Sequence, residues 1–173
     1  RLSSVLDVRM KEGNSKRFEV NGGIGIIASR LTVEGPIWKD RISFIVSGRR
    51  TYADLFLALS SEEALRNNKL YFYDLNAKVN YKIDDNNHLF LSGYFGRDVF
   101  KNNFAKMSWG NGTGTIRWNH LFNKRLFSNF TFVYSDYRYM LGTPEGQSSS
   151  FEWNSSLRDA GIKGDLSYYL NTN

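Results

Sequence analysis

The residues of this chain that could perform chemistry are glycine-rich stretches, two histidines and scattered acidic side chains. Gly23, Gly25 and Ala28 match a relaxed form of the glycine fingerprint that holds a dinucleotide phosphate. That fingerprint requires a strand before it and a helix after it, whereas β-type residues and Glu34-Gly35-Pro36 follow here. We therefore interpret these glycines as marks of a strand with a bulge or a close backbone approach.

No catalytic or metal-binding constellation is visible in the sequence. The chain contains no Cys, which excludes disulfides, thiolate zinc sites and cysteine nucleophiles. His88 and His120 are the only histidines, and each lies beside an expected short turn. No motif joins a serine, a histidine and a carboxylate. We therefore expect no enzymatic activity, no cofactor and no metal.

The composition limits the class of protein. Aromatic residues make up 16% of the 173 residues, which favours β structure. The mean hydropathy of −0.45 is too polar for a bundle of membrane helices, and no apolar run approaches the ~18 residues that such a helix needs. The opening residues do not have the pattern of a signal peptide. The net charge of +6 serves solubility or favours an anionic partner, either nucleic acid or a lipopolysaccharide-type surface.

The clearest structural signal is the alternation of residues 70–83. Every second residue from Tyr71 to Ile83 is apolar or aromatic. From position 74 to position 82, the residues that alternate with these are all polar. Because successive strand side chains point to opposite faces, this pattern predicts one strand with one apolar face and one polar face. It is longer than the ~5–6 residues of a typical strand. Its length suits a strand that crosses a bilayer, which needs about 9–11 residues.

The same pattern recurs along the chain and predicts an all-β fold, an antiparallel up-and-down meander of about seven long strands. A polar turn at 84–87 leads into a second strand at 88–96. In residues 17–33 the apolar phase switches, which we interpret as one strand with a β-bulge. Residues 60–63 resemble a helix start inside the connection 51–69. The other expected strands are 2–10, 41–50, 112–122, 126–139 and 157–170.

The expected connections alternate in length. Residues 36–40, 84–87 and 123–125 are short, whereas 51–69, 98–106 and 141–154 are long. In a meander this alternation places all short turns at one end and all long loops at the other, as in a transmembrane β-barrel. Aromatic residues beside the short turns would form an interfacial girdle: Trp38, Tyr81, Trp118, Phe122, Tyr168 and Tyr169.

The apolar parity of the strands identifies the residues expected to face lipid. Ala77 should lie near the membrane midplane, and its neighbour Lys78 should point into the lumen, where substitution is tolerated. Arg41, Arg49, Arg50, Arg97 and Arg117 are expected to line that lumen or to lie near it. The expected lipid-facing residues are Phe44, Val46, Tyr73, Leu75, Ala77, Val79, Tyr81, Leu89, Leu91, Ile116, Trp118, Phe130, Phe132, Ile162 and Leu166.

The chain also resembles a known family. Residues 2–13 are similar to the closing strand of a plug and its exit into a barrel. Residues 18–37 are similar to a first barrel strand with a Gly-Pro turn, and residues 44–52 and 91–98 to the strands that follow. Through these diffuse motifs nearly the whole chain resembles a TonB-dependent receptor of the Gram-negative outer membrane.

The resemblance implies a division of the chain and a function. Residues 1–15 would be the end of the plug domain and a linker, and residues 16–173 the N-terminal part of a barrel of about 22 strands. The whole protein would be an active transporter that takes up a solute through this plugged barrel. The chain lacks an energy-transducing box, most of a plug and the remaining strands, so it would be a fragment of such a receptor.

The implied partners follow from that division. They are outer-membrane lipid, the plug domain and remaining barrel strands of the parent protein, and an energy-transducing TonB protein that binds an N-terminal region outside this chain. The location would be the outer membrane of a Gram-negative bacterium, with no nucleic acid bound. The sequence does not specify the solute.

The alternative is a soluble basic β-domain that binds nucleic acid or another anionic partner, since exposed aromatics on a charged sheet can stack with bases. The placement of the aromatics discriminates between the two interpretations. In the sequence they gather on the apolar parity near the turns, not on the parity of Lys and Arg.

Overall fold

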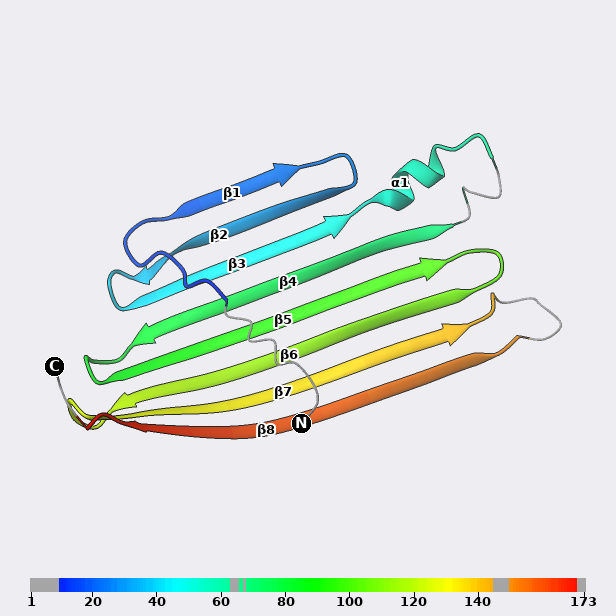
Figure 1. The fold of residues 1–173 in the computed structure, drawn as a ribbon. Coiled ribbons are helices and arrows are strands. Elements are labelled where there is room, and N and C mark those ends of the chain that lie inside the picture. Colours follow the sequence, from blue (N-terminus) through cyan, green and yellow to red (C-terminus); the bar gives the residue numbers. More distant parts are fainter. Residues whose placement is uncertain (1–9, 63–65, 67, 145–149, 171–173) are drawn as a thin grey trace.

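A computed structural model of the protein describes residues 10–62, 66, 68–144 and 150–170. Its main element is an eight-stranded sheet whose strand order equals the chain order, with every neighbouring pair antiparallel (Figure 1). The predicted all-β, up-and-down meander is therefore confirmed. The elements are β1 (Glu19–Ile24), β2 (Ala28–Trp38), β3 (Ile42–Thr51), α1 (Ala53–Ala58), β4 (Lys69–Lys82), β5 (Asn87–Lys101), β6 (Lys106–Leu121), β7 (Leu126–Gly142) and β8 (Glu152–Tyr168).

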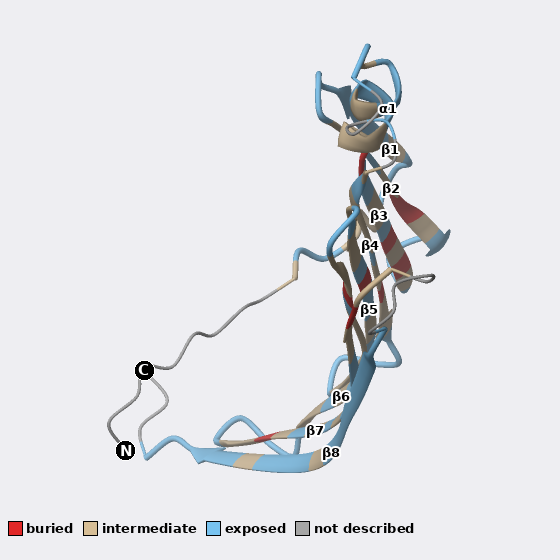
Figure 2. Ribbon diagram, turned by 90° about the vertical axis from the view of Figure 1, so that its right-hand side faces the viewer, coloured by how far each residue is buried: buried red, intermediate tan, exposed pale blue. Residues whose placement is uncertain are grey.

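The sheet is a single curved layer and does not close on itself. Figure 2, which looks along the strands, shows β6 to β8 bending away from the plane of β2 to β4. The described part of the segment before β1, residues 10–15, lies on the concave side of this curve (Figure 2). β1 and β8 are the two edges of the sheet. The sheet therefore has a concave face, a convex face and two open edges.

The first part of the chain differs from its prediction. Residues 17–33 do not form one bulged strand but a hairpin, β1 and β2, joined by residues 25–27. The turn is closed by the Gly25 N–H, which donates to the Ala28 carbonyl at 2.8 Å. The apolar residues change from one parity to the other because they belong to two separate strands, each with its own alternation. An irregular register does occur in β2, between Pro36 and Trp38.

The expected long loop 98–106 is also wrong. β5 continues to Lys101 and β6 begins at Lys106, so only residues 102–105 connect them. Asn102 shapes this turn, because its side-chain oxygen accepts hydrogen bonds from the N–H groups of Phe104 and Ala105 at 2.8 and 2.7 Å. The pairing of β5 with β6 therefore extends through residues that were assigned to a loop.

The ends of the sheet agree only in part with the predicted topology. The connections 39–41, 83–86 and 122–125 lie at one end, and 52–68 and 143–151 at the other, as predicted (Figure 1). The short turns 25–27 and 102–105 lie at the same end of the sheet as the long connections. The prediction that short turns and long loops occupy opposite ends is therefore wrong. α1 begins at Ala53, before the helix start that was predicted at residues 60–63. Of those four residues, residue 63 lies outside the described part of the chain. The predicted strand 2–10 lies outside them too, except for Met10, which is not in a strand.

Candidate functional site

The register of the sheet gathers the apolar residues of its strands into continuous rows. One row begins at Phe44, which pairs with Val79, and Val79 pairs with Leu91. Leu91 in turn pairs with Ile116, and the row continues through the partners Phe132 and Ile162. Since directly paired residues point to the same face, six strands contribute apolar side chains to one row.

Every residue that was predicted to face lipid lies on this same face of the sheet. The row next to Phe44 contains Val46 and Ala77, and the row on its other side contains Tyr81, Leu89 and Trp118. The remaining members join these rows or the adjacent ones through their partners; they are Tyr73, Leu75, Phe130 and Leu166. The register thus places all of these residues on one face, as predicted. That lipid covers this face is a further prediction.

Aromatic side chains concentrate at two levels of this face. Near the turn 122–125, Trp118 stacks on Phe130 with ring centroids 6.0 Å apart, and its indole N–H donates to Asn87 at 3.2 Å. Towards the opposite end, Tyr73 lies 6.1 Å from Phe95. Eight residues separate Tyr81 from Tyr73, which corresponds to about 27 Å along a strand. The row midway between them contains the small residues Ala77, Gly93, Gly114 and Ala160, together with Val46 and Tyr134.

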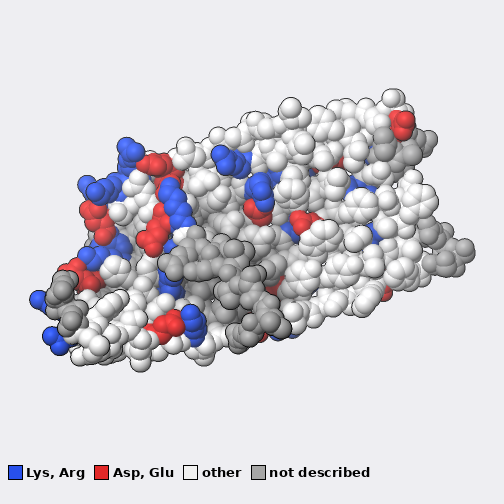
Figure 3. All heavy atoms as spheres, viewed as in Figure 1, with Lys and Arg blue, Asp and Glu red and all other residues white. Residues whose placement is uncertain are grey.

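The opposite face of the sheet is polar. Its rows contain Ser43, Asn80 and Arg117, and neighbouring positions carry Asn119 and Asn129. Figure 3 shows this face, with charged side chains of both signs gathered towards the end of the connections 39–41 and 83–86. Among the described residues, buried polar atoms without a hydrogen-bond partner include Asn80 Oδ1, Arg117 Nε, Asn119 Oδ1 and Asn129 Oδ1. Such atoms indicate a face that takes up water or a polar partner.

Two expectations about this polar face need correction. Arg49 and Arg117 lie on it, but Arg50 and Arg97 lie on the apolar face, because both pair with Tyr73. Aromatic residues are not confined to the apolar face either. Phe90 lies on the polar face, with Lys78 Nζ at 5.3 Å and Arg117 Cζ at 4.6 Å from its ring centroid.

Residues 10–15 cross the polar face as a strap that is bound to β2 and β4. Lys11 Nζ forms an ion pair with Glu34 Oε1 at 2.6 Å, and the Asn14 N–H donates to Glu34 Oε2 at 3.0 Å. The hydrogen bond to Glu34 raises the pKa of Lys11. Glu34 is only 1% exposed, although the sheet has a single layer. Because the strap lies on the concave side, the polar face is the concave face and the apolar face is the convex one (Figure 2).

Lys78 is the second anchor of the strap. Its Nζ donates to the Met10 carbonyl at 3.1 Å and lies 3.5 Å from a Glu12 carboxylate oxygen. Only 6% of Lys78 is exposed. It therefore points to the polar face as predicted, but it is a buried contact and not a freely solvated lining residue, so its substitution is no longer expected to be neutral.

Gly13 allows the strap to approach the sheet closely. A Cβ atom at this position would overlap the Phe44 carbonyl oxygen of β3. That oxygen belongs to the backbone of a paired strand, so it cannot move aside as a flexible side chain would. The absence of a side chain at position 13 is therefore a condition for the contacts of Lys11 and Asn14.

We predict that Gly13→Ala lifts the strap from the sheet. Overlap of this kind costs typically 1–3 kcal/mol, and Lys11 and Lys16 would become better substrates for trypsin. Limited proteolysis of the folded protein measures this effect. Gly114→Ala is the matched control, since nothing lies within 4 Å of a Cβ at position 114. Equal cleavage rates in both variants would contradict the role assigned to Gly13.

The histidines and acidic residues do not assemble a metal site within the described part of the chain. His88 lies on the concave face beside Asn119, whereas His120 lies on the convex face and contacts Asn87 at 2.8 Å. Among the described residues, no group of three or more His, Asp or Glu side chains could hold a metal ion. No helix in this part of the chain has the length and apolar character needed to cross a membrane.

Comparison with protein-family models, with curated proteins and with solved structures finds no match for this chain. The features that point to a function are therefore the two faces of the sheet, the strap and the two open edges.

Proposed function

We propose that this chain is part of the wall of a transmembrane β-barrel in a Gram-negative outer membrane, and that the whole protein is a solute transporter of the TonB-dependent type. The observation that carries the proposal is the division of one curved sheet into an apolar convex face and a polar concave face. A barrel wall requires this division, because its outer side meets hydrocarbon and its inner side meets water or a plug.

The exposure of the convex face supports the proposal. Ile162 is 84% exposed, and Leu91, Ile116 and Phe132 of the same row are also exposed. A soluble protein rarely leaves a contiguous apolar patch of this extent uncovered. Lipid tails would cover it, and the two aromatic levels would then lie at the two membrane interfaces.

The concave face supports a lumen that is filled by water and by a plug. Its unpaired buried atoms require polar partners, and the strap already covers part of it. In the proposal, residues 1–15 end the plug and residues 16–173 begin the barrel. Lys11, Asn14 and Lys78 then form the junction between the two domains.

The two edges support a sheet that continues. β8 is a strand of 17 residues, nearly all exposed, and its outer backbone groups have no strand beside them within the described residues. Long uncovered edges promote association, and a closed barrel removes them. The remaining barrel strands of the parent protein would pair with β1 and β8.

The expected transport mechanism follows from the family resemblance. Extracellular loops and the plug would capture the solute, and an energy-transducing TonB protein would then move the plug through a region outside this chain. No enzymatic step and no cofactor are required in this proposal.

Site-directed spin labelling tests the membrane assignment. Ile116→Cys on the convex face and its neighbour Thr115→Cys on the concave face are labelled in the full-length protein in lipid vesicles. We expect the label at 116 to collide mainly with oxygen, which concentrates in hydrocarbon, and the label at 115 with a water-soluble nickel complex. Equal accessibility of both labels to the nickel complex would reject a lipid-covered convex face.

The transport assignment needs a separate test. A strain that lacks the protein should lose uptake of at least one solute from the medium, and in the parent strain that uptake should stop when the proton-motive force is dissipated. If the uptake of every solute measured is unchanged, the protein is not a transporter. The spin-label result would then be evidence for a barrel only.

One observation favours the alternative, a basic β-domain that binds nucleic acid. Phe90 between Lys78 and Arg117 combines an aromatic ring with two cations on the concave face. Such sites stack bases, with strong salt dependence. Salt-sensitive binding of single-stranded DNA that is lost in Phe90→Ala would support the alternative.

A further inference from the structure

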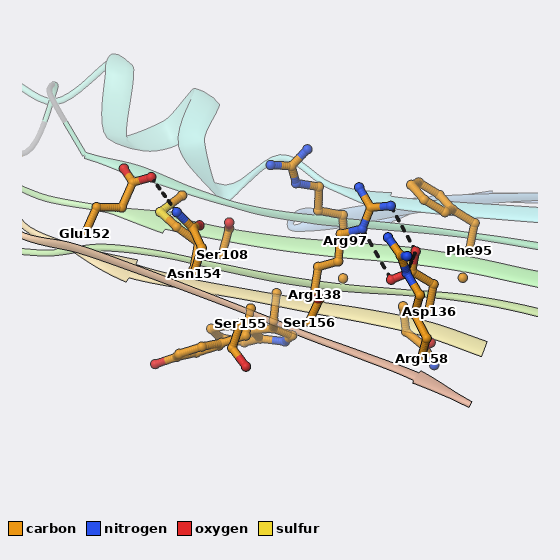
Figure 4. A pocket seen from close by; sticks show the side chains of 17 residues that line it. Phe95, Arg97, Ser108, Asp136, Arg138, Glu152, Asn154, Ser155, Ser156 and Arg158 are labelled. Carbon is orange, nitrogen blue, oxygen red and sulfur yellow. Dashed lines mark hydrogen bonds and ion pairs between the residues drawn. The ribbon is translucent and has the colours of Figure 1, made fainter. Parts of the chain in front are cut away.

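A hollow in the convex face interrupts its apolar surface near the connections 102–105 and 143–151. It has a volume of about 670 Å³ and lies over β5 to β8 (Figure 4). Its side chains include Phe95, Arg97, Asp136, Arg138 and Arg158. It is separate from the strap and from the polar concave face.

Two glycines create the hollow. Gly110 stands between its partners Arg97 and Arg138, and Gly112 stands between Phe95 and Asp136. Since β6 has no side chain at either position, the flanking side chains surround a space. A third arginine, Arg158, joins from β8 as the partner of Asp136.

The hollow has an excess of positive charge. Arg138 forms two hydrogen bonds to Asp136, at 2.9 and 3.3 Å, and Arg158 lies 3.6 Å from the same carboxylate. The lining thus contains three arginines against two carboxylates, Asp136 and Glu152. The side chains of Arg138 and Arg158 remain 72% and 65% exposed, so a large part of each is open to an incoming anion.

We infer that this arginine hollow binds a phosphomonoester, and that in the cell the phosphate belongs to the headgroup of a membrane lipid. Planar guanidinium groups bind phosphate oxygens through paired, charge-assisted hydrogen bonds. The lipid source rests on the proposed function: the hollow lies on the convex face at the aromatic level of Tyr73 and Phe95, since Arg97 pairs with Tyr73 and Phe95 is part of the lining. At that level a barrel wall meets headgroups instead of tails.

Asp136 distinguishes a binding site from a structural ion-pair cluster. If Asp136 only pairs with Arg138 and Arg158, then Asp136→Asn weakens the sheet and changes no binding. If the cluster binds an anion, the carboxylate competes with it, and Asp136→Asn tightens binding by several-fold.

The test measures binding of lipid A, with and without its phosphate groups, to the full-length protein in phosphatidylcholine nanodiscs. We expect the phosphorylated form to bind better, and the triple variant Arg97→Gln, Arg138→Gln, Arg158→Gln to lose at least about tenfold in affinity, as expected when several charge-assisted hydrogen bonds are lost. Arg49→Gln is the matched control. It removes an arginine that also pairs with an aspartate, Asp74 at 2.8 Å, on the opposite face at a similar level.

The outcomes separate the possible sources of the anion. Unchanged lipid A binding in the triple variant would overturn the inference, as would an equal loss in Arg49→Gln. If inorganic phosphate binds to the protein in detergent and lipid A does not, the site takes a free anion and the lipid assignment is wrong. Arg97→Gln alone serves if the triple variant does not fold. The spin-label experiment decides the barrel independently, so the two proposals can fail separately.

Discussion

A lysine at position 77 is expected to destabilise the full-length protein in a bilayer by about 2–4 kcal/mol, the cost of a cation at the midplane of a lipid-facing barrel surface. Ala77 lies on the convex face, in the row midway between the two aromatic levels, where its neighbour across β5 is Gly93. Denaturant unfolding of the protein in lipid vesicles measures the change. Asn76→Lys is the matched control, because Asn76 is the adjacent residue on the concave face, and it should be nearly neutral.

A larger apolar residue at the same position separates lipid from a packed protein core. Ala77→Leu meets only fluid tails in a bilayer and should be neutral or slightly stabilising. In a packed core the same change would cost typically 1–3 kcal/mol through overpacking. A loss above about 1 kcal/mol, read against that range, would mean that protein covers the convex face.

Removal of the Glu34 carboxylate should produce the second large effect. Glu34→Ala leaves the Asn14 N–H and Lys11 without their acceptor, in a position where the carboxylate is almost completely buried. Loss of hydrogen bonds to a charged group costs about 1.5–3 kcal/mol. We expect the strap to detach, seen as rapid hydrogen exchange at the Asn14 amide together with a lower unfolding midpoint.

Two variants sharpen this experiment. Glu34→Gln keeps the shape and one acceptor, so its amide exchange at Asn14 should fall between those of the native protein and Glu34→Ala. Glu62→Gln changes an exposed glutamate far from the strap and should change neither quantity. Native-like protection of Asn14 in Glu34→Ala would show that other contacts hold the strap.

The faces of the sheet were predictable because the evidence for them is local. Alternation assigns each side chain to a face within its own strand, and Phe44, Ile116 and Phe132 were all assigned to the same kind of face before any pairing was known. The register then joins them, since a one-residue slip in any strand would have exchanged its faces. Period-two alternation was therefore sufficient for this part of the fold.

Chain reversals were harder to predict where the turn itself resembles a strand. Ile26 and Ile27 have β-type side chains, yet the chain turns there, and only the changed phase marked the place. Asp98 and Lys101 suggested a loop, yet both are paired in β5. Composition alone does not separate a polar strand end from a loop.

The strap could not be predicted because it depends on distant contacts. Nothing in the sequence around Glu34 indicated a contact, because its partners are Lys11 and Asn14, which precede it by 20 residues or more. Arg50 and Arg97 were misplaced for another reason: charge was taken as a guide to the polar face, although strand parity placed both on the other one.

The strand order of the sheet also determines how it can assemble. Each strand pairs only with its neighbours in sequence, so no step has to wait for a distant segment of the chain, a topology that favours fast folding. Hairpins can be added one after another, from β1 onwards. At every stage the newest strand presents a straight, hydrogen-bonding template to whatever arrives next. The open edge of β8 is such a template, so in the proposed barrel a second copy of the chain would compete there with the next strand of the parent protein.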